Sequence, residues 1–244
     1  MVLMDVNGIS VILPTYRGDE PDALRTAIES VLEQTRPPDE LLIIEDGPLT
    51  PSLKSVIESI DPQRPIQVSS VTLSENRGLG NALRIGVEKA RHGLIARMDA
   101  DDISVRNRFE RQLLFFKSNP ETDIVGGYIE EFDSDPESPI ARREVPESHR
   151  DIRQMARFRS PMNHATVMFR RKTVLSCGNY RSVDPMEDYD LWARMLRDGA
   201  VFRNIPEVLL KVRAGPDMYE RRGGLKYARE ELRTQLQLYQ CNIT

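Results

Sequence analysis

The stretch LIARMDADDIS, residues 94–104, places a short apolar run directly before a cluster of carboxylates. The apolar residues 94–96 are typical of a buried strand. Asp99, Asp101 and Asp102 then fall within four positions. Like charges this close repel one another and raise one another's pKa. Their place at the end of a buried strand therefore needs a physical reason.

A buried strand followed by polar residues occurs repeatedly in the first hundred positions. The expected strands are 9–13, stopped by Pro14, and 40–47, 66–73 and 93–98. Apolar residues recur between them at the spacing of one helix face, in 24–32, 53–60 and 79–90. Strands that alternate with amphipathic helices predict an α/β fold with a Rossmann-like, mostly parallel central sheet flanked by helices.

The carboxyl ends of these strands predict where a ligand binds. Open parallel sheets take their ligands at that edge. The four expected ends are residues 14–16, 45–47, 74–78 and 99–102. Three of the four are strongly polar, so the site is expected there.

The second half of the chain is less regular. Helices are expected at about 105–116 and 187–199, and strands at 123–132, 164–169 and 208–212. The Pro- and charge-rich residues 133–150 are expected to form an exposed connection. An apolar stripe with basic neighbours predicts a C-terminal amphipathic helix, formed by Leu225, Ala228, Leu232, Leu236 and Tyr239. Such a helix would attach weakly to anionic lipid, or pack on the domain or in a homodimer.

Composition limits the class of protein. The 244 residues fit one α/β domain or two small lobes that share a sheet, and the net charge of -4 argues against a nucleic-acid partner. Cys177 and Cys241 form neither a disulfide framework nor a metal-ligand spacing, which indicates a reducing, cytoplasmic compartment. We expect neither a secretory signal nor a membrane span.

The carboxylates after residue 98 have two interpretations. They could be solvated, with Asp102 capping a helix that begins near Ser104. They could instead bind Mg²⁺ or Mn²⁺, which take oxygen ligands and share carboxylates with substrate phosphates. A dinucleotide fingerprint is absent, because Gly78 and Gly80 are followed by Leu83 where the third glycine would stand.

Five motifs in order carry a resemblance to a known family. They are SVILPTY, DELLIIEDG, ENRGLGNALRIG, RMDADD and MEDYDLW. Together they resemble family 2 glycosyltransferases over residues 9–222, and in particular the bacterial enzymes that assemble exopolysaccharide, capsule or O-antigen repeat units. The resemblance implies a GT-A fold and an inverting transfer from a nucleotide sugar. It also implies a nucleotide-sugar half at 1–102, an acceptor-binding and catalytic half at 103–216, and the C-terminal helix at 217–244.

The resemblance also implies roles for single residues. Asp188 would be the catalytic base, and Asp46 would contact the nucleobase. Asp101 would be the metal ligand. Asp99 would hold the ribose and is a possible second metal ligand. The expected nucleotide-sugar site comprises Pro14, Thr15, Tyr16, Asp46, Asn76, Gly78, Met98, Ala100 and the acids Asp99 and Asp101. The sequence departs from many relatives at Glu45 and Pro48, at Leu83-Arg84, and in KVRAGPDMY, which contains no histidine.

Four further residues have two interpretations each. Glu187, His164 and Trp192 could contact the acceptor, and Arg213 could bind a diphosphate. Their structural alternatives are a favourable helix start for Glu187, a local hydrogen bond for His164, core packing for Trp192, and a solvated basic stretch for Arg213. Core packing is the favoured interpretation of Trp192, since one face of its helix must be buried.

These observations predict a metal-dependent inverting glycosyltransferase that uses Mn²⁺ or Mg²⁺. The donor would be a UDP-sugar, namely galactose, glucose or an N-acetylated form, and the acceptor a polyprenyl-diphosphate-linked saccharide at the inner face of the membrane. The alternatives are a sugar nucleotidyltransferase and a non-catalytic nucleotide-sugar-binding protein. The nucleotidyltransferase would need a glycine-rich basic loop, which PTYRGDEPD is not.

Overall fold

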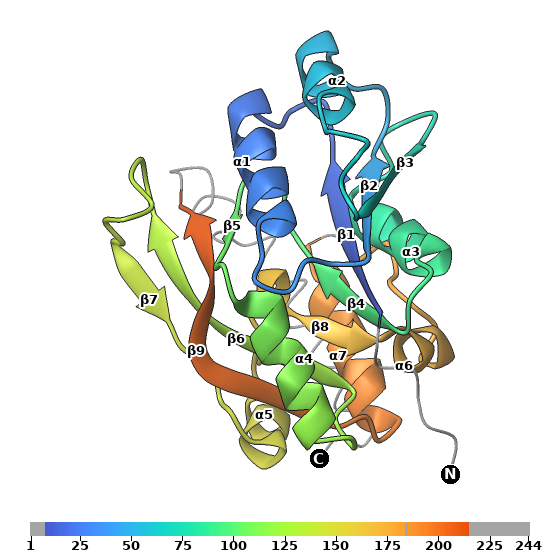
Figure 1. Cartoon of the computed structure of the whole chain (residues 1–244). Helices are drawn as coiled ribbons and strands as arrows, with labels where there is room; N and C mark the ends of the chain where they lie inside the picture. Colours follow the sequence, from blue (N-terminus) through green and yellow to red (C-terminus); the bar gives the residue numbers. More distant parts are fainter. Residues whose placement is uncertain (1–7, 184, 215–244) are drawn as a thin grey trace.

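The computed structural model describes residues 8–183 and 185–214, which form a mixed sheet flanked by helices (Figure 1). Four parallel strands form one half: β1 (Ile9–Thr15), β2 (Glu40–Glu45), β3 (Gln67–Thr72) and β4 (Leu94–Arg97). The other strands are β5 (Ile103–Ser104), β6 (Ile124–Phe132), β7 (Ala141–Arg143), β8 (Met168–Arg170) and β9 (Phe202–Arg213). The order is β3-β2-β1-β4-β8-β6-β9-β5, with β7 on β6. The predicted α/β class and mostly parallel first half are confirmed.

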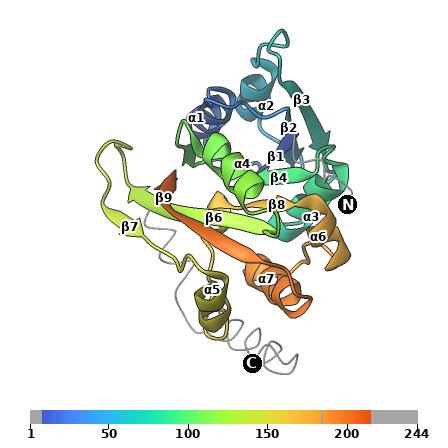
Figure 2. The same ribbon diagram turned by 60° about the horizontal axis from the view of Figure 1, so that its bottom comes forward.

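Both faces of the sheet are buried by helices (Figure 2). One face is covered by α1 (Pro21–Leu32), α2 (Pro51–Glu58) and α4 (Arg108–Ser118). The other is covered by α3 (Leu79–Lys89), α6 (Arg171–Ser176) and α7 (Glu187–Arg197), while α5 (His149–Met155) inserts Ile152 into the same core. Alternation along β1 explains this arrangement, since Val11 and Leu13 join the first core and Ile12 the second. A strand buried on both faces reads as a continuous apolar run.

The structure corrects several expected boundaries. β1 continues through Pro14 because its pairing with β4 ends at Ile12, so the missing proline N–H breaks no hydrogen bond to that neighbour. The strand expected at 164–169 is wrong in its first half: His164–Thr166 is a 3-10 turn, and β8 begins at Met168. The 133–150 segment contains β7 and the start of α5, which Ser148 caps.

Two expectations concern long helices. Among the described residues, none of the helices has the length and apolar character needed to span a membrane. The predicted amphipathic helix at 217–244 lies outside the described residues.

Trp192 of α7 is completely buried, with its ring edge-on to Phe202 and Tyr180. We expect Trp192→Ala to lower the free energy of unfolding by about 3–5 kcal/mol, because it leaves a large cavity in the second core. Leu114→Ala on the exposed side of α4 is the control, with a change within about 0.5 kcal/mol. Urea denaturation compares the two, and equal losses would contradict the core position of Trp192.

Candidate active site

The carboxyl ends of β1, β2, β3 and β4 lie at one edge of the sheet, because these strands are parallel and paired in register. This edge brings the segments after Thr15, Glu45, Thr72 and Arg97 together. The four strand ends predicted to carry a site therefore converge.

Asp46 organises the loop that follows β3. Its two carboxylate oxygens accept hydrogen bonds from the backbone N–H groups of Arg77 at 2.7 Å and Gly78 at 2.9 Å. The side chain of Asn76 also accepts from Gly78 N, at 3.2 Å. Gly78 has a φ of 82°, which a residue without a Cβ adopts easily, and it precedes α3. Asp46 is thus a buried anchor of this loop, with lone pairs left for a ligand donor.

Glu45 does not take part in that arrangement. Its carboxylate is 2% exposed and is paired with the ammonium group of Lys54 on α2. It also accepts a hydrogen bond from Thr72 Oγ1 at 3.1 Å. The departure from the common family sequence at this position is therefore balanced within the fold, by a lysine that supplies the opposite charge.

The end of β1 is fixed by an acid that sequence reasoning missed. Asp19 accepts hydrogen bonds from Thr15 Oγ1 at 2.8 Å and from Tyr16 N at 2.9 Å. The ring of Tyr16 stays 42% exposed and packs over Gly18. The charge of Asp19 contributes to the raised pKa of Asp101, so this turn lies close to the acids after β4. No spacing signal in the sequence would have distinguished Asp19 from an ordinary turn residue.

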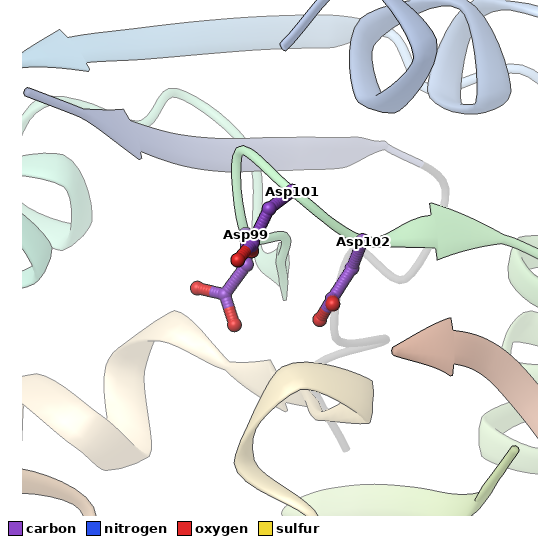
Figure 3. Close-up of side chains that lie close together, drawn as sticks. All are labelled: Asp99, Asp101 and Asp102. Atoms are coloured by element: carbon purple, nitrogen blue, oxygen red, sulfur yellow. The ribbon is translucent and has the colours of Figure 1, made fainter. Parts of the chain in front are cut away.

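The acid cluster consists of Asp99, Asp101 and Asp102, which each offer a carboxylate oxygen within 4.8 Å of the others. Figure 3 shows the three side chains on the same side of the loop after β4. Desolvation, then the charges of Asp99 and Asp19, raises the pKa of Asp101 to about 6. Burial, then Asp99 and Asp101, raises the pKa of Asp102 well above its ordinary value. Excess negative charge is concentrated here, as the sequence indicated.

Arg97, at the end of β4, is next to this cluster, and sequence reasoning missed it as well. Its side chain is 5% exposed and its guanidinium is ion-paired with Asp99. Burial disfavours the charged guanidinium, but the charges of Asp99, Asp102 and Glu187 outweigh it and raise the pKa of Arg97. Behind it, Arg108 donates to the carbonyl oxygen of Arg97 at 2.8 Å. The apolar pattern of the strand gave no indication that Arg97 is buried.

The donor set fits a hard divalent cation. Its ligand atoms are carboxylate oxygens, which Mg²⁺ and Mn²⁺ prefer. Asp101 is exposed and Asp99 half-buried, whereas Asp102 is buried and accepts a hydrogen bond from Arg213 N at 3.2 Å. Asp99 and Asp101 would therefore hold the ion. Met98 and Ala100, on either side of Asp99 in the chain, are buried, and neither has a side-chain oxygen to offer an ion.

Asp188 lies in the first turn of α7, where its carboxylate accepts a hydrogen bond from Ser160 Oγ at 3.1 Å. Burial raises its pKa, while the N–H of Tyr189, the hydroxyl of Ser160 and the charge of Arg97 oppose that rise. The same buried cation thus acts on Asp188 and on the acid cluster. Ser160 stands in an irregular stretch, and no sequence signal identified it.

Gly80 allows the segment that leads into α7 to pack closely against the first turn of α3. A Cβ on this residue would lie 2.4 Å from the carbonyl oxygen of Arg181 and 3.3 Å from the Cβ of Glu187. Glycine is therefore needed where the first turn of α3 meets the segment before α7 at Arg181. Gly80 thus has a packing role in the fold.

The remaining predicted residues lie at different distances from the surface. His164 Nε2 is 3.0 Å from the hydroxyl of Tyr180, and burial followed by the charge of Arg97 holds its pKa well below the ordinary value. Trp192 is in the core, as favoured, and offers no exposed face to an acceptor. Glu187 is buried beside α3. The Arg213 guanidinium stacks over Phe132 and donates to Asp133 O at 3.4 Å.

A parallel sheet edge with an acid cluster, together with a helix that carries a further carboxylate, is the arrangement that the resemblance to GT-A glycosyltransferases led us to expect. The family model "Glycosyl transferase family 2" matches residues 10–178. The chain belongs to this family and is a glycosyltransferase. The match includes the acid cluster and ends before Asp188.

Curated relatives extend the similarity over nearly the whole chain. The amylovoran biosynthesis glycosyltransferase AmsE of Erwinia amylovora is 39% identical over 96% of this chain and 85% of its own length. The Escherichia coli UDP-Gal:alpha-D-GlcNAc-diphosphoundecaprenol beta-1,3-galactosyltransferase is 37% identical over 98% of this chain and 86% of its own. The resemblance to bacterial polysaccharide glycosyltransferases is thereby confirmed.

Solved structures support the fold. The mannosyltransferase PcManGT of Pyrobaculum calidifontis, in complex with GDP-Man and Mn²⁺, has a TM-score of 0.71 at 16% identity, over 94% of this chain and 64% of its own. S. aureus TarS 1-349 in complex with UDP-GlcNAc has a TM-score of 0.69 at 15% identity, over 95% and 72%. The chain spans 43% of a longer TarS structure. The GT-A fold expectation is confirmed.

The raised pKa of Asp101 predicts a pH-dependent effect of Asp101→Asn in metal-free protein. From about pH 4 to about pH 6 the folded wild type binds more protons than its unfolded state, so its stability falls as pH rises. The asparagine does not ionise, so the melting temperature of the variant minus that of wild type should increase over this range and then level off. Melting curves in excess chelator measure this difference, and a pH-independent difference would contradict the crowding of the acids.

Proposed function

We propose that this glycosyltransferase transfers a hexose, with galactose first among the candidates, from a UDP-sugar to a hydroxyl of a saccharide linked to a lipid diphosphate. The product would be a repeat unit of a cell-surface polysaccharide. The strongest support is the 37% identity over 98% of the chain to a relative whose name states this donor and acceptor. Glucose and N-acetylated hexoses remain the other donors to test.

The donor would lie across the carboxyl ends of β1, β2 and β4. Pro14, Thr15 and Tyr16 would line the nucleotide pocket, and Tyr16 offers an exposed ring for stacking. Asp46 and the loop it anchors at Asn76 and Gly78 would lie next to the base. Asp99 and Asp101 would face the ribose and the diphosphate.

The acid cluster would hold Mn²⁺ or Mg²⁺ through Asp101 and Asp99. A bound divalent ion supplies positive charge to the departing diphosphate. Contacts within the protein position these acids. Arg97 pairs with Asp99 and orients it, and the backbone N–H of Arg213 donates a hydrogen bond to Asp102. Arg213 remains a candidate for a diphosphate contact.

The transfer itself would be a single displacement. The oxygen of the acceptor hydroxyl attacks the anomeric carbon, and the bond from that carbon to the diphosphate oxygen breaks on the opposite face. Asp188 takes the hydroxyl proton as general base, and the nucleoside diphosphate leaves with the bonding electrons. Ser160 and the N–H of Tyr189 orient the Asp188 carboxylate. Glu187 and His164 would contact the acceptor.

The two alternatives are less well supported. A sugar nucleotidyltransferase does not agree with membership of glycosyl transferase family 2. A non-catalytic binding protein would be favoured by a misplaced Asp188, whereas Asp188 lies within the electrostatic influence of the same Arg97 that pairs with Asp99. Peripheral membrane contact, a homodimer and the division at 102 and 216 remain proposals.

Metal dependence is tested by UDP binding. We expect UDP to bind more tightly in Mn²⁺ or Mg²⁺ than in excess chelator, because the ion joins the acid cluster to the diphosphate. Asp101→Ala should remove this difference, while Asp61→Ala, which is exposed and outside the acid cluster, should keep it. Calorimetry or a thermal-shift titration measures the effect, and equal UDP affinity with and without metal in wild type would exclude it.

The base is tested by Asp188→Asn, which keeps the size of the side chain and removes its charge. Donor binding should be retained, and the transfer rate should fall by about 10²-fold or more, the range for a lost general base. Glu187→Gln is the matched comparison from the adjacent position. Near-normal transfer by Asp188→Asn together with inactive Glu187→Gln would reassign the base to Glu187, and two fully active variants would remove this site from the mechanism.

A further inference from the structure

The surface of α5 carries positive charge that the transfer reaction does not use. Between Ser148 and Ser160 the chain has four arginines and one aspartate, in a protein with a net charge of -4. Arg150, Arg153, Arg157 and Arg159 are all exposed. Within the described part of the chain, no salt bridge joins any of them to a carboxylate. This charge is therefore available to a partner.

Three of the arginines lie around one hollow at α5 and the turn after it. Arg150 and Arg153 are three residues apart on α5, which places them on the same side of the helix, and Arg157 lies in the turn that follows. These three, with His149 and Gln154, line a single surface hollow. The opposite face is fixed in the protein, since Ile152 and Ala156 are buried in the second core. We call Arg150, Arg153 and Arg157 the arginine face.

Neighbouring residues extend this surface. Arg203 of β9 acts electrostatically on His149, and together with burial and Arg153 it lowers the pKa of that histidine. Phe158 is 69% exposed and stands between Arg157 and Arg159. Clustered arginines next to an exposed aromatic ring are a combination suited to the headgroup region of an anionic bilayer.

The arginine face is connected to the acceptor side of the site. Ser160, directly after Arg159, donates a hydrogen bond from its hydroxyl to the Asp188 carboxylate at 3.1 Å. The Tyr189 hydroxyl of α7 donates a hydrogen bond to the carbonyl oxygen of Ala156 at 2.7 Å. The segment after α5 is thus attached to the first turn of α7. Both views place α5 at the end of the molecule opposite α1 and α2 (Figures 1 and 2).

We propose that the arginine face is the surface with which this enzyme docks on an anionic phospholipid bilayer, and that docking places the first turn of α7 toward a lipid-linked acceptor. The inference rests on the proposed function for its acceptor. The ligand is the array of headgroup phosphates at the bilayer surface. Because the contacts are exposed and electrostatic, attachment weakens as salt rises.

Vesicle co-sedimentation of the full chain tests the surface without any substrate. Wild type should bind vesicles that contain phosphatidylglycerol at low salt, and not vesicles of phosphatidylcholine alone. The triple variant Arg150→Gln, Arg153→Gln, Arg157→Gln should partition about a hundredfold less, since each arginine near an anionic surface contributes several-fold. Lys89→Gln, Lys117→Gln, Lys172→Gln removes the same charge from other exposed positions and should bind like wild type.

Three outcomes would overturn the inference. They are no binding of wild type to phosphatidylglycerol vesicles at low salt, equal loss in both triple variants, and displacement from vesicles by free pyrophosphate at constant ionic strength. The last would assign the arginines to a single diphosphate. Melting temperatures confirm that the variants are folded. The rate of transfer to a water-soluble acceptor analogue should be the same in the arginine variant and in wild type. If neither protein transfers sugar, the proposed function is refuted, but the vesicle-binding result is unaffected.

Discussion

The ion pair between Arg97 and Asp99 is the interaction on which the candidate site depends. Three carboxylates gathered after β4 would repel one another strongly without a counter-charge. The buried guanidinium of Arg97 supplies that positive charge. A lysine ammonium group at the same buried position would lose its proton more readily. The same charge opposes ionisation of His164 and favours ionisation of Asp188. One side chain therefore influences the charge states of the acid cluster, of His164 and of Asp188 together.

Backbone contacts hold these charged groups in place. Both carboxylate oxygens of Asp46 accept hydrogen bonds from the loop that leads into α3, and Gly80 lets the first turn of α3 pack against Arg181 in the segment before α7. A side chain at Gly80 would clash with the carbonyl oxygen of Arg181, in the segment that leads into α7 and Asp188. The precision of the site thus derives from a loop anchor and from one close approach, in addition to the strands that end there.

The parallel half of the fold and the acids at its edge could be predicted from the sequence. Long apolar runs and helical stripes are signals that tertiary contacts seldom reverse, and Asp99, Asp101 and Asp102 stand out because like charges rarely cluster without cause. Arg97, Asp19 and Ser160 could not be predicted, since their importance lies in which distant groups they meet. β7 and α6 were missed because short elements have too few residues to establish a period.

The order of the sheet has a consequence for synthesis of the protein. β4 pairs with β1 on one side and with β8 on the other, and β8 is encoded more than seventy positions later. Until residues 168–170 leave the ribosome, the strand that ends in the acids has an unpaired edge. Loop closure over that separation makes this pairing a late and slow event. The four parallel strands β1 to β4 can thus pair before β8 and α7 have been synthesised, and an unpaired apolar strand edge is a place where a chaperone would bind.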